Sequence, residues 1–116
     1  MLIQVLKSKI THAAITEANL HYEGSITIPE DLMDAVDFIA GEKVQVLNIN
    51  NGQRFETYIL KGVSGSTEIC LNGPAARLGV IGDRIMIISY ALMSPEDARQ
   101  FSPKILHLDE FNKIKN

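Results

Sequence analysis

A β-hairpin signal constrains the fold of this chain more than any other feature of its sequence. Residues 43–49 begin by alternating valine with polar or charged side chains, which is typical of a half-buried strand. Asn51 and Gly52 follow, a dipeptide that readily takes the positive φ angles of a two-residue hairpin turn. Residues 54–60 have the composition of the returning strand. The pattern predicts two antiparallel strands joined by a tight turn.

One good helix pattern runs from Pro29 to Gly41. The proline occupies the first turn, the acidic residues after it interact favourably with the helix dipole, and the glycine is the expected C-terminal stop. Leu32, Val36 and Ile39 fall on one face of this helix. The pattern predicts that this face packs on the core.

The remaining predicted elements are short and mostly extended. A helical turn beginning at Ser94 separates the last two strands. The predicted strands cover residues 2–7, 26–28, 68–71, 84–93 and 104–108. Because closure removes the edges that short strands otherwise expose, many short strands around one helix favour a small closed barrel. The fold class is therefore predicted to be mainly β, with one or two short helices.

Length, charge and composition favour one domain that acts on a small molecule or a protein. The 116 residues, 46% of them hydrophobic, suffice for one core, so residues 1–116 are predicted to be a single domain. A formal charge of −3 argues against nucleic acid as a partner. The first apolar run ends at Lys7 and no later run approaches membrane-spanning length, so we expect a cytoplasmic protein without membrane contact.

The cysteine and histidine residues do not suggest a disulfide or a metal site. Cys70 is the sole cysteine and stands in an apolar run, which predicts a buried core residue. His12, His21 and His107 lack the spacing of a metal-binding pair, so no metal is expected.

The Gly24-Ser25 pair, between two extended pieces, is suited to backbone chemistry. The Ser25 hydroxyl can attack the Gly24 carbonyl, which moves the acyl group from nitrogen to oxygen and leaves an ester. Gly24 lacks a Cβ and so admits a distorted backbone and the close approach of a nucleophile. Elimination of the ester leaves dehydroalanine, and hydrolysis of that group gives a pyruvoyl group at the new N-terminus. Taken alone, the pair is more simply an ordinary turn.

The chain as a whole resembles the bacterial aspartate 1-decarboxylases, from residue 1 to residue 110 or so. The resemblance rests on separated segments whose order and spacing are similar to those of that family. These segments are residues 6–10 (Leu-Lys-Ser-Lys-Ile), 20–28 (Leu-His-Tyr-Glu-Gly-Ser-Ile-Thr-Ile), 51–58 (Asn-Gly-Gln-Arg-Phe-Glu-Thr-Tyr), 72–76 (Asn-Gly-Pro-Ala-Ala) and 82–83 (Gly-Asp).

This resemblance implies a double-psi β-barrel that assembles as a homotetramer. It also implies conversion of L-aspartate to β-alanine and carbon dioxide for pantothenate synthesis. Cleavage is expected to give residues 1–24 and 25–116, with a covalent pyruvoyl cofactor derived from Ser25 and no metal. A separate maturation factor that assists cleavage is an open alternative to unassisted processing.

Three residues match the catalytic and self-cleavage positions of that family. Ser25 matches the position that becomes the pyruvoyl group, forms a Schiff base with the substrate amine and acts as the electron sink. Tyr58 matches the proton donor, and Thr57 matches a residue used in both self-cleavage and substrate binding. Since neighbours in a strand point to opposite faces, we expect a bulge, a twist or a subunit boundary to bring Thr57 and Tyr58 to one site. Both are otherwise ordinary strand residues.

Further residues match the substrate-binding positions. Arg54 matches a residue that binds the substrate carboxylate, a role for which the planar guanidinium fork is suited. Lys9 matches a basic residue near the site. The turn that lines the pocket is matched by Asn72, Gly73, Pro74 and Ala75. The alternatives are a solvated arginine, a surface lysine and a simple tight turn.

The chain departs from the family pattern at two places. Many members have a histidine directly after the position of Ile10, whereas this chain has Thr11 followed by His12, which leaves the role of that histidine open. Members often have alanine where Pro74 stands, and proline has no N–H to donate. Donors in the pocket are therefore expected from residues 73, 75 or 76.

Two other functions remain open at this point. A non-catalytic β-barrel that binds a ligand or a partner protein would keep the Gly24-Ser25 bond intact. A pyruvoyl enzyme for another amino acid would keep the cleavage but change the pocket. Aspartate is favoured because Arg54 and Lys9 suit a substrate with two carboxylates and the pocket-lining turn is too small to recognise a large side chain.

Overall fold

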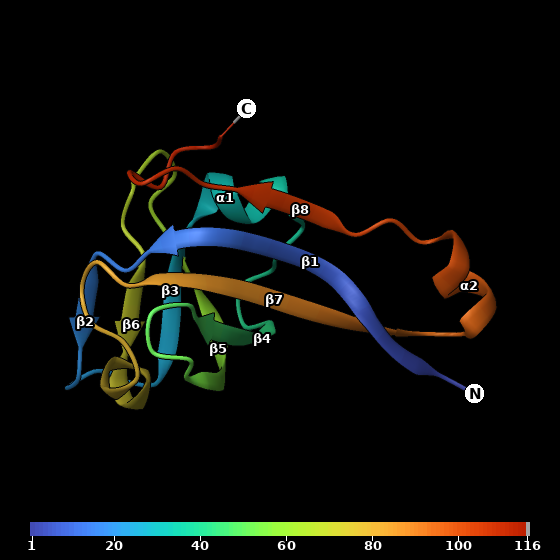
Figure 1. Cartoon of the computed structure of the whole chain (residues 1–116), viewed down its shortest axis with the longest axis horizontal. Coiled ribbons are helices and arrows are strands. Elements are labelled where there is room, and N and C mark those ends of the chain that lie inside the picture. The colour runs from blue at the N-terminus through green and yellow to red at the C-terminus, as the bar shows by residue number, and fades with distance from the viewer. Residues whose placement is uncertain (116) are drawn as a thin grey trace.

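The computed structural model describes residues 1–115, so Asn116, the last residue of the predicted larger fragment, lies outside the described residues. Within that range the chain forms eight strands, two short α-helices and one 3-10 helix (Figure 1). In chain order they are β1 (Ile3–Ala14), β2 (Glu17–Asn19), β3 (Ser25–Pro29), α1 (Glu30–Ala35), β4 (Lys43–Asn48), β5 (Arg54–Gly62), β6 (Cys70–Asn72), η1 (Gly73–Arg77), β7 (Arg84–Met93), α2 (Pro95–Gln100) and β8 (Lys104–His107).

The strands form one sheet that curls around an apolar core. Their order is β2-β6-β3-β5-β4-β7-β1-β8. Strands β1 and β2 stand far apart in this order but are separated in the chain only by Ile15 and Thr16, whose backbone nitrogens donate to the carbonyls of Asp83 and Ile69 at 2.9 Å. The short connection between β1 and β2 thus closes the barrel. The prediction of a mainly β fold is confirmed.

Branched aliphatic side chains fill the barrel, as expected for strands whose inner face is buried. Ile10, Ile26, Ile59 and Ile87 are fully buried and come from four different strands. Cys70 is also buried, in agreement with the sequence. No helix in residues 1–115 has the length and hydropathy needed to cross a membrane.

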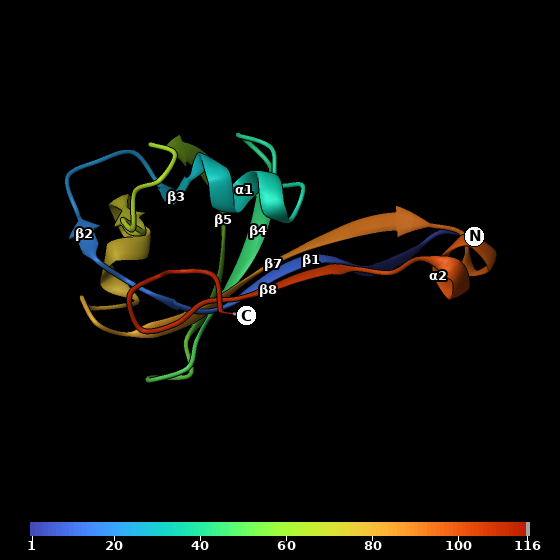
Figure 2. The ribbon, with the colours of Figure 1, turned by 90° about the horizontal axis from the view of Figure 1, so that it is seen from above.

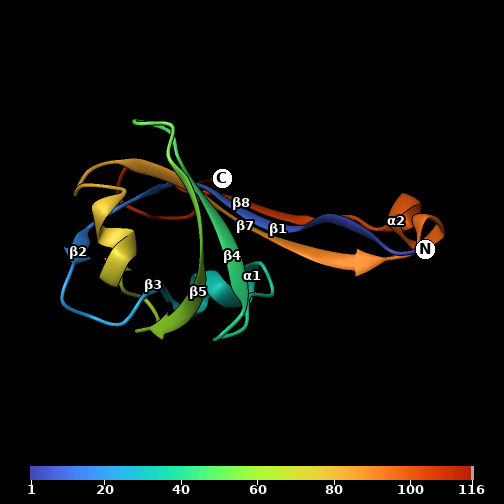
Figure 3. The same cartoon turned by 90° about the horizontal axis from the view of Figure 1, so that it is seen from below.

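An arm extends from one side of the barrel. It consists of the first half of β1, the second half of β7, α2 and β8, and Figure 2 and Figure 3 show it projecting well beyond the other strands. Helix α2 begins where the sequence predicts a helical turn, because the Ser94 hydroxyl accepts a hydrogen bond from the Asp97 backbone nitrogen at 3.1 Å. The molecule consequently measures 42 × 30 × 24 Å along its principal axes.

Strand β1 is longer than the predicted strand at residues 2–7. It continues to Ala14 and pairs with β7 through two register shifts, one between Leu6 and Ser8 and one between Ile10 and Ala13. At the second shift His12 takes a φ of 64°. Bulges of this kind interrupt the alternation of buried and exposed side chains, which is why the sequence pattern ends early.

The predicted helix between residues 29 and 41 is wrong in its second half. Helix α1 ends at Ala35, and Asp37 takes a φ of 58°. Val36 and Phe38, two residues apart, are 1% and 4% exposed, and a continuing helix would place them on different faces. Because the helix ends before Val36, both side chains can be buried in the core. Ile39, predicted on the packed face, is 69% exposed.

The hairpin is confirmed, but its turn is longer than predicted. Strands β4 and β5 pair antiparallel, and the Asn48 nitrogen donates to the Gln53 carbonyl at 2.8 Å across a four-residue loop. Of Asn51 and Gly52 only the glycine has a positive φ, of 76°. The side-chain oxygen of the buried Asn48 accepts hydrogen bonds from the backbone nitrogens of Asn50 and Asn51, and these bonds stabilise the longer loop.

Two smaller differences concern β6 and its neighbour β2. Strand β6 covers residues 70–72 rather than 68–71, because Asn72 pairs with Ser25. Strand β2 was not predicted from the sequence. It is only three residues long and is held by parallel pairing with β6, a partner distant in sequence.

Candidate active site

Ser25 is the first residue of β3, at the point where the chain passes from an exposed loop into the barrel. His21, Tyr22 and Glu23 are exposed, whereas Ser25 is 0% exposed. The next residue, Ile26, is buried and pairs with Ile59 of β5 and with Leu71 of β6. Ser25 itself pairs with Asn72 of β6, so the Gly24-Ser25 bond lies directly before the part of β3 that is held by strands on both sides.

The Ser25 hydroxyl belongs to a small network of buried polar groups. Asn72 lies opposite Ser25 in the antiparallel β3–β6 pair, and its Nδ2 donates to Ser25 Oγ at 2.9 Å and to Thr27 Oγ1 at 3.0 Å. The Cys70 thiol donates to Asn72 Oδ1 at 3.0 Å. Ser25 Oγ in turn lies 3.4 Å from the Glu23 carbonyl oxygen, a long hydrogen bond.

Neither Thr27 nor Cys70 was assigned to the site from the sequence, where Cys70 was predicted only as a buried core residue. Period-two alternation could have found them, since Thr27 follows Ser25 by two residues and Cys70 precedes Asn72 by two. Burial raises the pKa of the Cys70 thiol, and the negative charge of Glu17 raises it further. The thiol is thus held in its protonated form and is a hydrogen-bond donor.

The close approach of backbone at the cleavage point depends on Gly73 rather than on Gly24. Gly73 has a φ of 65°, and a Cβ on it would lie 2.5 Å from the Tyr22 carbonyl oxygen and 2.8 Å from the Gly24 nitrogen. A Cβ on Gly24 would meet only the Pro74 Cδ, at an ordinary contact distance of 3.5 Å. The loop that precedes Ser25 therefore packs onto the start of η1, where only glycine fits.

A groove of about 320 Å³ lies beside this junction. It is lined by Gly24, Phe55, Glu56, Thr57, Tyr58, Pro74, Ala75 and Leu78. Five of the residues singled out from the sequence thus share one surface, and Phe55, Glu56 and Leu78 join them. The last three stand in or near the segments that resemble the family but carry no residue type that signals a site on its own.

The groove follows an edge of β5, which explains how Thr57 and Tyr58 both reach it. In residues 1–115 the strand pairing of β5 with β3 starts only at Ile59, whereas its pairing with β4 covers Arg54 to Tyr58 without a register shift. Side chains from both faces of a strand border its free edge. Of the bulge, twist or subunit boundary expected from the sequence, this pairing has no bulge, and a single chain brings both side chains to the groove.

The remaining predicted residues lie outside the groove lining. Asn72 and Gly73 are buried behind it, next to Ser25 and Gly24. Arg54 is exposed at the start of β5, two residues before Glu56 and on the same face as Tyr58. Lys9 lies in a row across the sheet with Ile88, Gln45 and Glu56, three strands and hence about 14 Å from β5.

The electrostatic environment of the groove is mild. Glu56 forms an ion pair with Lys43 at 3.0 Å, but the two side chains are 63% and 72% exposed, so the pair contributes little to stability. It does place a cation next to the one carboxylate that lines the groove. Arg54 adds a second exposed cation on the same strand.

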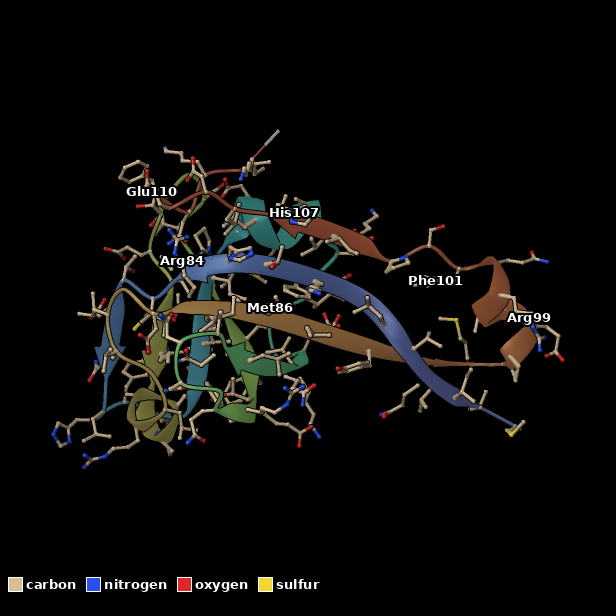
Figure 4. All side chains as sticks on the ribbon, in the orientation of Figure 1. Arg84, Met86, Arg99, Phe101, His107 and Glu110 are labelled. Carbon is tan, nitrogen blue, oxygen red and sulfur yellow. The ribbon has the colours of Figure 1, made fainter. Side chains whose placement is uncertain are left out.

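A larger hollow, of about 770 Å³, lies elsewhere. It is formed around His12, Arg84, His107 and the segment after β8. In the view of Figure 4, Arg84, His107 and Glu110 lie toward the upper edge, whereas η1 lies at the lower edge. Arg84 donates to the carbonyls of His12 at 2.8 Å and of Asp109 at 3.1 Å, so it ties the chain end to β1.

Within residues 1–115 no cluster of three His, Cys, Asp or Glu side chains is close enough to hold a metal ion.

Comparison with solved structures bears on the fold. The computationally designed protein msDPBB_sym2, named for the double-psi β-barrel, superposes with a TM-score of 0.50 over 75% of this chain and 99% of its own, at 14% sequence identity. At this identity the likeness concerns the fold alone. It confirms the predicted double-psi β-barrel.

Comparison with known sequences bears on the family. The model of the aspartate decarboxylase family matches residues 1–115. The aspartate 1-decarboxylase of Acetivibrio thermocellus is 59% identical over 100% of this chain and 92% of its own. Those of Caldicellulosiruptor saccharolyticus and Phocaeicola vulgatus are 58% and 57% identical, over 98% of this chain and 89% and 99% of theirs. This chain therefore belongs to the aspartate decarboxylase family.

Proposed function

We propose that this chain is the precursor of an aspartate 1-decarboxylase, which cuts itself between Gly24 and Ser25 and then converts L-aspartate to β-alanine and carbon dioxide. The product would enter pantothenate synthesis. One observation carries the proposal: the buried Ser25 hydroxyl accepts a hydrogen bond from Asn72 beside a groove that contains Gly24, Thr57 and Tyr58. Family membership independently supports the reaction.

The proposed cleavage is an acyl shift followed by elimination. Ser25 Oγ bonds to the Gly24 carbonyl carbon, the Gly24–Ser25 C–N bond breaks, and the hydroxyl proton ends on the released nitrogen. Loss of the Ser25 α-proton then breaks the Cβ–Oγ bond, which frees residues 1–24 with a carboxylate terminus and leaves dehydroalanine. Water replaces the nitrogen of that residue, ammonia leaves, and a pyruvoyl group begins the fragment 25–116.

The residues present fit a pyruvoyl group formed at Ser25. Ser25 is buried directly behind Gly24, which lines the groove, and one N–H of the Asn72 amide points at the Ser25 oxygen. The group supplies an electron sink for the loss of carbon dioxide. Tyr58, 39% exposed in the same groove, would give a proton to the carbon that loses its carboxylate, and Thr57 would stabilise the oxygen that develops negative charge during the acyl shift.

Substrate binding is assigned to cations and to the small turn at the start of η1. Arg54 would bind one aspartate carboxylate through its guanidinium fork. Pro74 and Ala75 line the groove with small side chains, and Asn72 and Gly73 support them from behind. Lys9 would serve the site from a second copy of the chain, because its own strand is three strands away from β5.

A homotetramer in the cytoplasm completes the proposal. The arm presents large apolar side chains to solvent, among them Leu2, Leu92, Phe101 and Ile105, which are 64%, 63%, 40% and 47% exposed. Figure 4 labels Arg99 and Phe101, both of which lie on the arm. Apolar surface of this extent on a small protein is typical of a protein–protein interface. Light scattering is expected to give four times the 12.8 kDa of one chain.

Intact-mass spectrometry under denaturing conditions tests the proposal. Freshly purified protein should resolve with time into residues 1–24 and 25–116, and the larger fragment should have a ketone in place of an N-terminal amine. Ser25→Ala, the matched control, should stay full length and inactive. A wild-type chain that stays intact after prolonged warming, with and without a lysate of its source cells, would favour the non-catalytic barrel, and cleavage only with lysate would indicate a maturation factor.

The substrate requires a separate assay. Cleaved protein should release carbon dioxide from L-aspartate faster than from L-glutamate or uncharged amino acids. Activity on another amino acid without activity on aspartate would retain the cleavage but replace the substrate. A free serine amine at residue 25 would instead indicate a contaminating protease.

A further inference from the structure

Four polar side chains form a two-by-two patch on one face of the β3–β6 pair. Ser25 is opposite Asn72, and Thr27 is opposite Cys70. Between them, Ile26 and Leu71 point to the other face and are fully buried in the core. Because Ile26 and Leu71 are packed in the core, they fix the backbones of both strands, and the four polar side chains on the other face keep a fixed spacing.

The Asn72 amide uses its full set of donors within this patch. Its two Nδ2 hydrogens are matched by two hydroxyl oxygens, Ser25 Oγ at 2.9 Å and Thr27 Oγ1 at 3.0 Å. Its Oδ1 accepts from the Cys70 thiol at 3.0 Å. Asn72 is 4% exposed, so water does not substitute for these partners at low cost.

We propose that Cys70 and Thr27 are positioning residues for self-cleavage, because together they hold the Asn72 amide with its nitrogen toward the Ser25 hydroxyl. In the opposite orientation the amide nitrogen would face the Cys70 sulfur, which is a weak acceptor, and one N–H would lose its partner. The thiol donates to Oδ1 and so favours this orientation, and the Thr27 hydroxyl, which can donate or accept, accepts the second N–H that this orientation presents. The inference rests on the self-cleavage proposed above.

The orientation matters because the charge on Ser25 Oγ changes during the acyl shift. As the hydroxyl proton leaves, negative charge develops on Oγ, and an N–H that points at it becomes a stronger, charge-assisted hydrogen bond. An amide oxygen in the same place would accept a hydrogen bond from the hydroxyl and would then repel the negative charge that develops on Oγ. Cys70 and Thr27 thus act on Ser25 only through Asn72.

The test separates the hydrogen bond from the volume of each side chain. Cys70→Val and Thr27→Val fill the space without a hydrogen-bonding group, whereas Cys70→Ser and Thr27→Ser retain one. The rate constant for appearance of residues 25–116 is measured by intact mass from freshly purified precursor, together with the thermal midpoint of each variant. We expect both valine variants to cleave about five- to tenfold more slowly than wild type, the loss of one hydrogen bond, and both serine variants to stay within about threefold.

Each outcome decides the inference. Rescue by serine at both positions supports it, because a purely structural role would follow the thermal midpoint rather than the hydrogen-bonding group. Valine variants that cleave at the wild-type rate overturn it, as does a Cys70→Ser chain as slow as Cys70→Val. If Cys70→Val does not fold, Cys70→Ala takes its place in the same comparison. Wild-type protein that never cleaves refutes the proposed function itself, and this inference with it.

Discussion

Gly73 packs directly against the backbone of Gly24, so closely that a Cβ on Gly73 would lie 2.9 Å from the Gly24 Cα. The two glycines come from the start of η1 and from the loop before β3, segments that are far apart in the sequence. The contact sets the position of the bond that is proposed to break. It places the strictest steric requirement of the site on a residue that undergoes no chemistry.

Gly73→Ala is therefore expected to slow self-cleavage strongly, because the new methyl group must push the Tyr22–Gly24 backbone away from Asn72. The positive φ adds about 1–3 kcal/mol of strain. Intact-mass kinetics checks the rate. The matched control is Gly82→Ala, at a φ of 96° with no atom within 4 Å of the new Cβ, which carries backbone strain without the clash and should cleave normally. Equal slowing in both variants would attribute the effect to strain alone.

Tyr58→Phe is expected to cleave itself normally yet to decarboxylate aspartate slowly. Proton delivery by a positioned side chain typically contributes about a hundredfold or more, so kcat should fall by that order. Tyr90→Phe is the control, since Tyr90 is similarly exposed at 45% but donates its hydroxyl to Gln45, outside the groove. Unchanged β-alanine production by Tyr58→Phe would remove Tyr58 from the reaction.

Arg54→Lys should fold and cleave but lose most activity with aspartate, about tenfold or more in kcat/KM. An ammonium group cannot reproduce the two parallel hydrogen bonds of a guanidinium fork and misplaces the carboxylate. Steady-state kinetics tests this, with Arg99→Lys on the exposed surface of α2 as the control. Values within about twofold of wild type would exclude Arg54 from substrate binding.

Acid should weaken the turn that follows β8 through Asp109. The carboxylate accepts hydrogen bonds from the backbone nitrogens of Lys113 at 3.0 Å and Phe111 at 2.8 Å, and these bonds lower the pKa of Asp109 below its usual 3.8. Since the folded-state pKa is the lower one, the stabilisation is present above pH 3.8 and is lost as the pH falls through the folded-state value.

Urea unfolding of wild type and Asp109→Asn at neutral and acidic pH measures this contribution. Asparagine keeps the accepting oxygen but does not titrate, so the stability advantage of the wild type should shrink as the pH falls. A difference between the two proteins that stays constant with pH would contradict the assignment.

Local patterns in the sequence determined the elements whose partners are close by. The β4–β5 hairpin, α2 at its serine cap and the buried run around Cys70 are set by alternation, turn residues and capping, which act over a few residues. The Gly24-Ser25 pair and the segments around Thr57 and Asn72 also carried the family resemblance. These local patterns predict the structure correctly because they depend only on each residue's own chemistry and on its neighbours in the sequence.

Contacts between distant segments decided the rest. Helix α1 ends earlier than predicted because Val36 and Phe38 are both buried in the core. Strand β1 is longer than its sequence pattern predicts because it stays paired with β7 across two bulges. The groove exists because β3 begins to pair with β5 only at Ile59, which leaves an edge where Thr57 and Tyr58 meet. The Asn72 network needs Ser25, 47 residues away, to lie opposite it. No local pattern encodes such a pairing, because its energy arises only when the barrel closes.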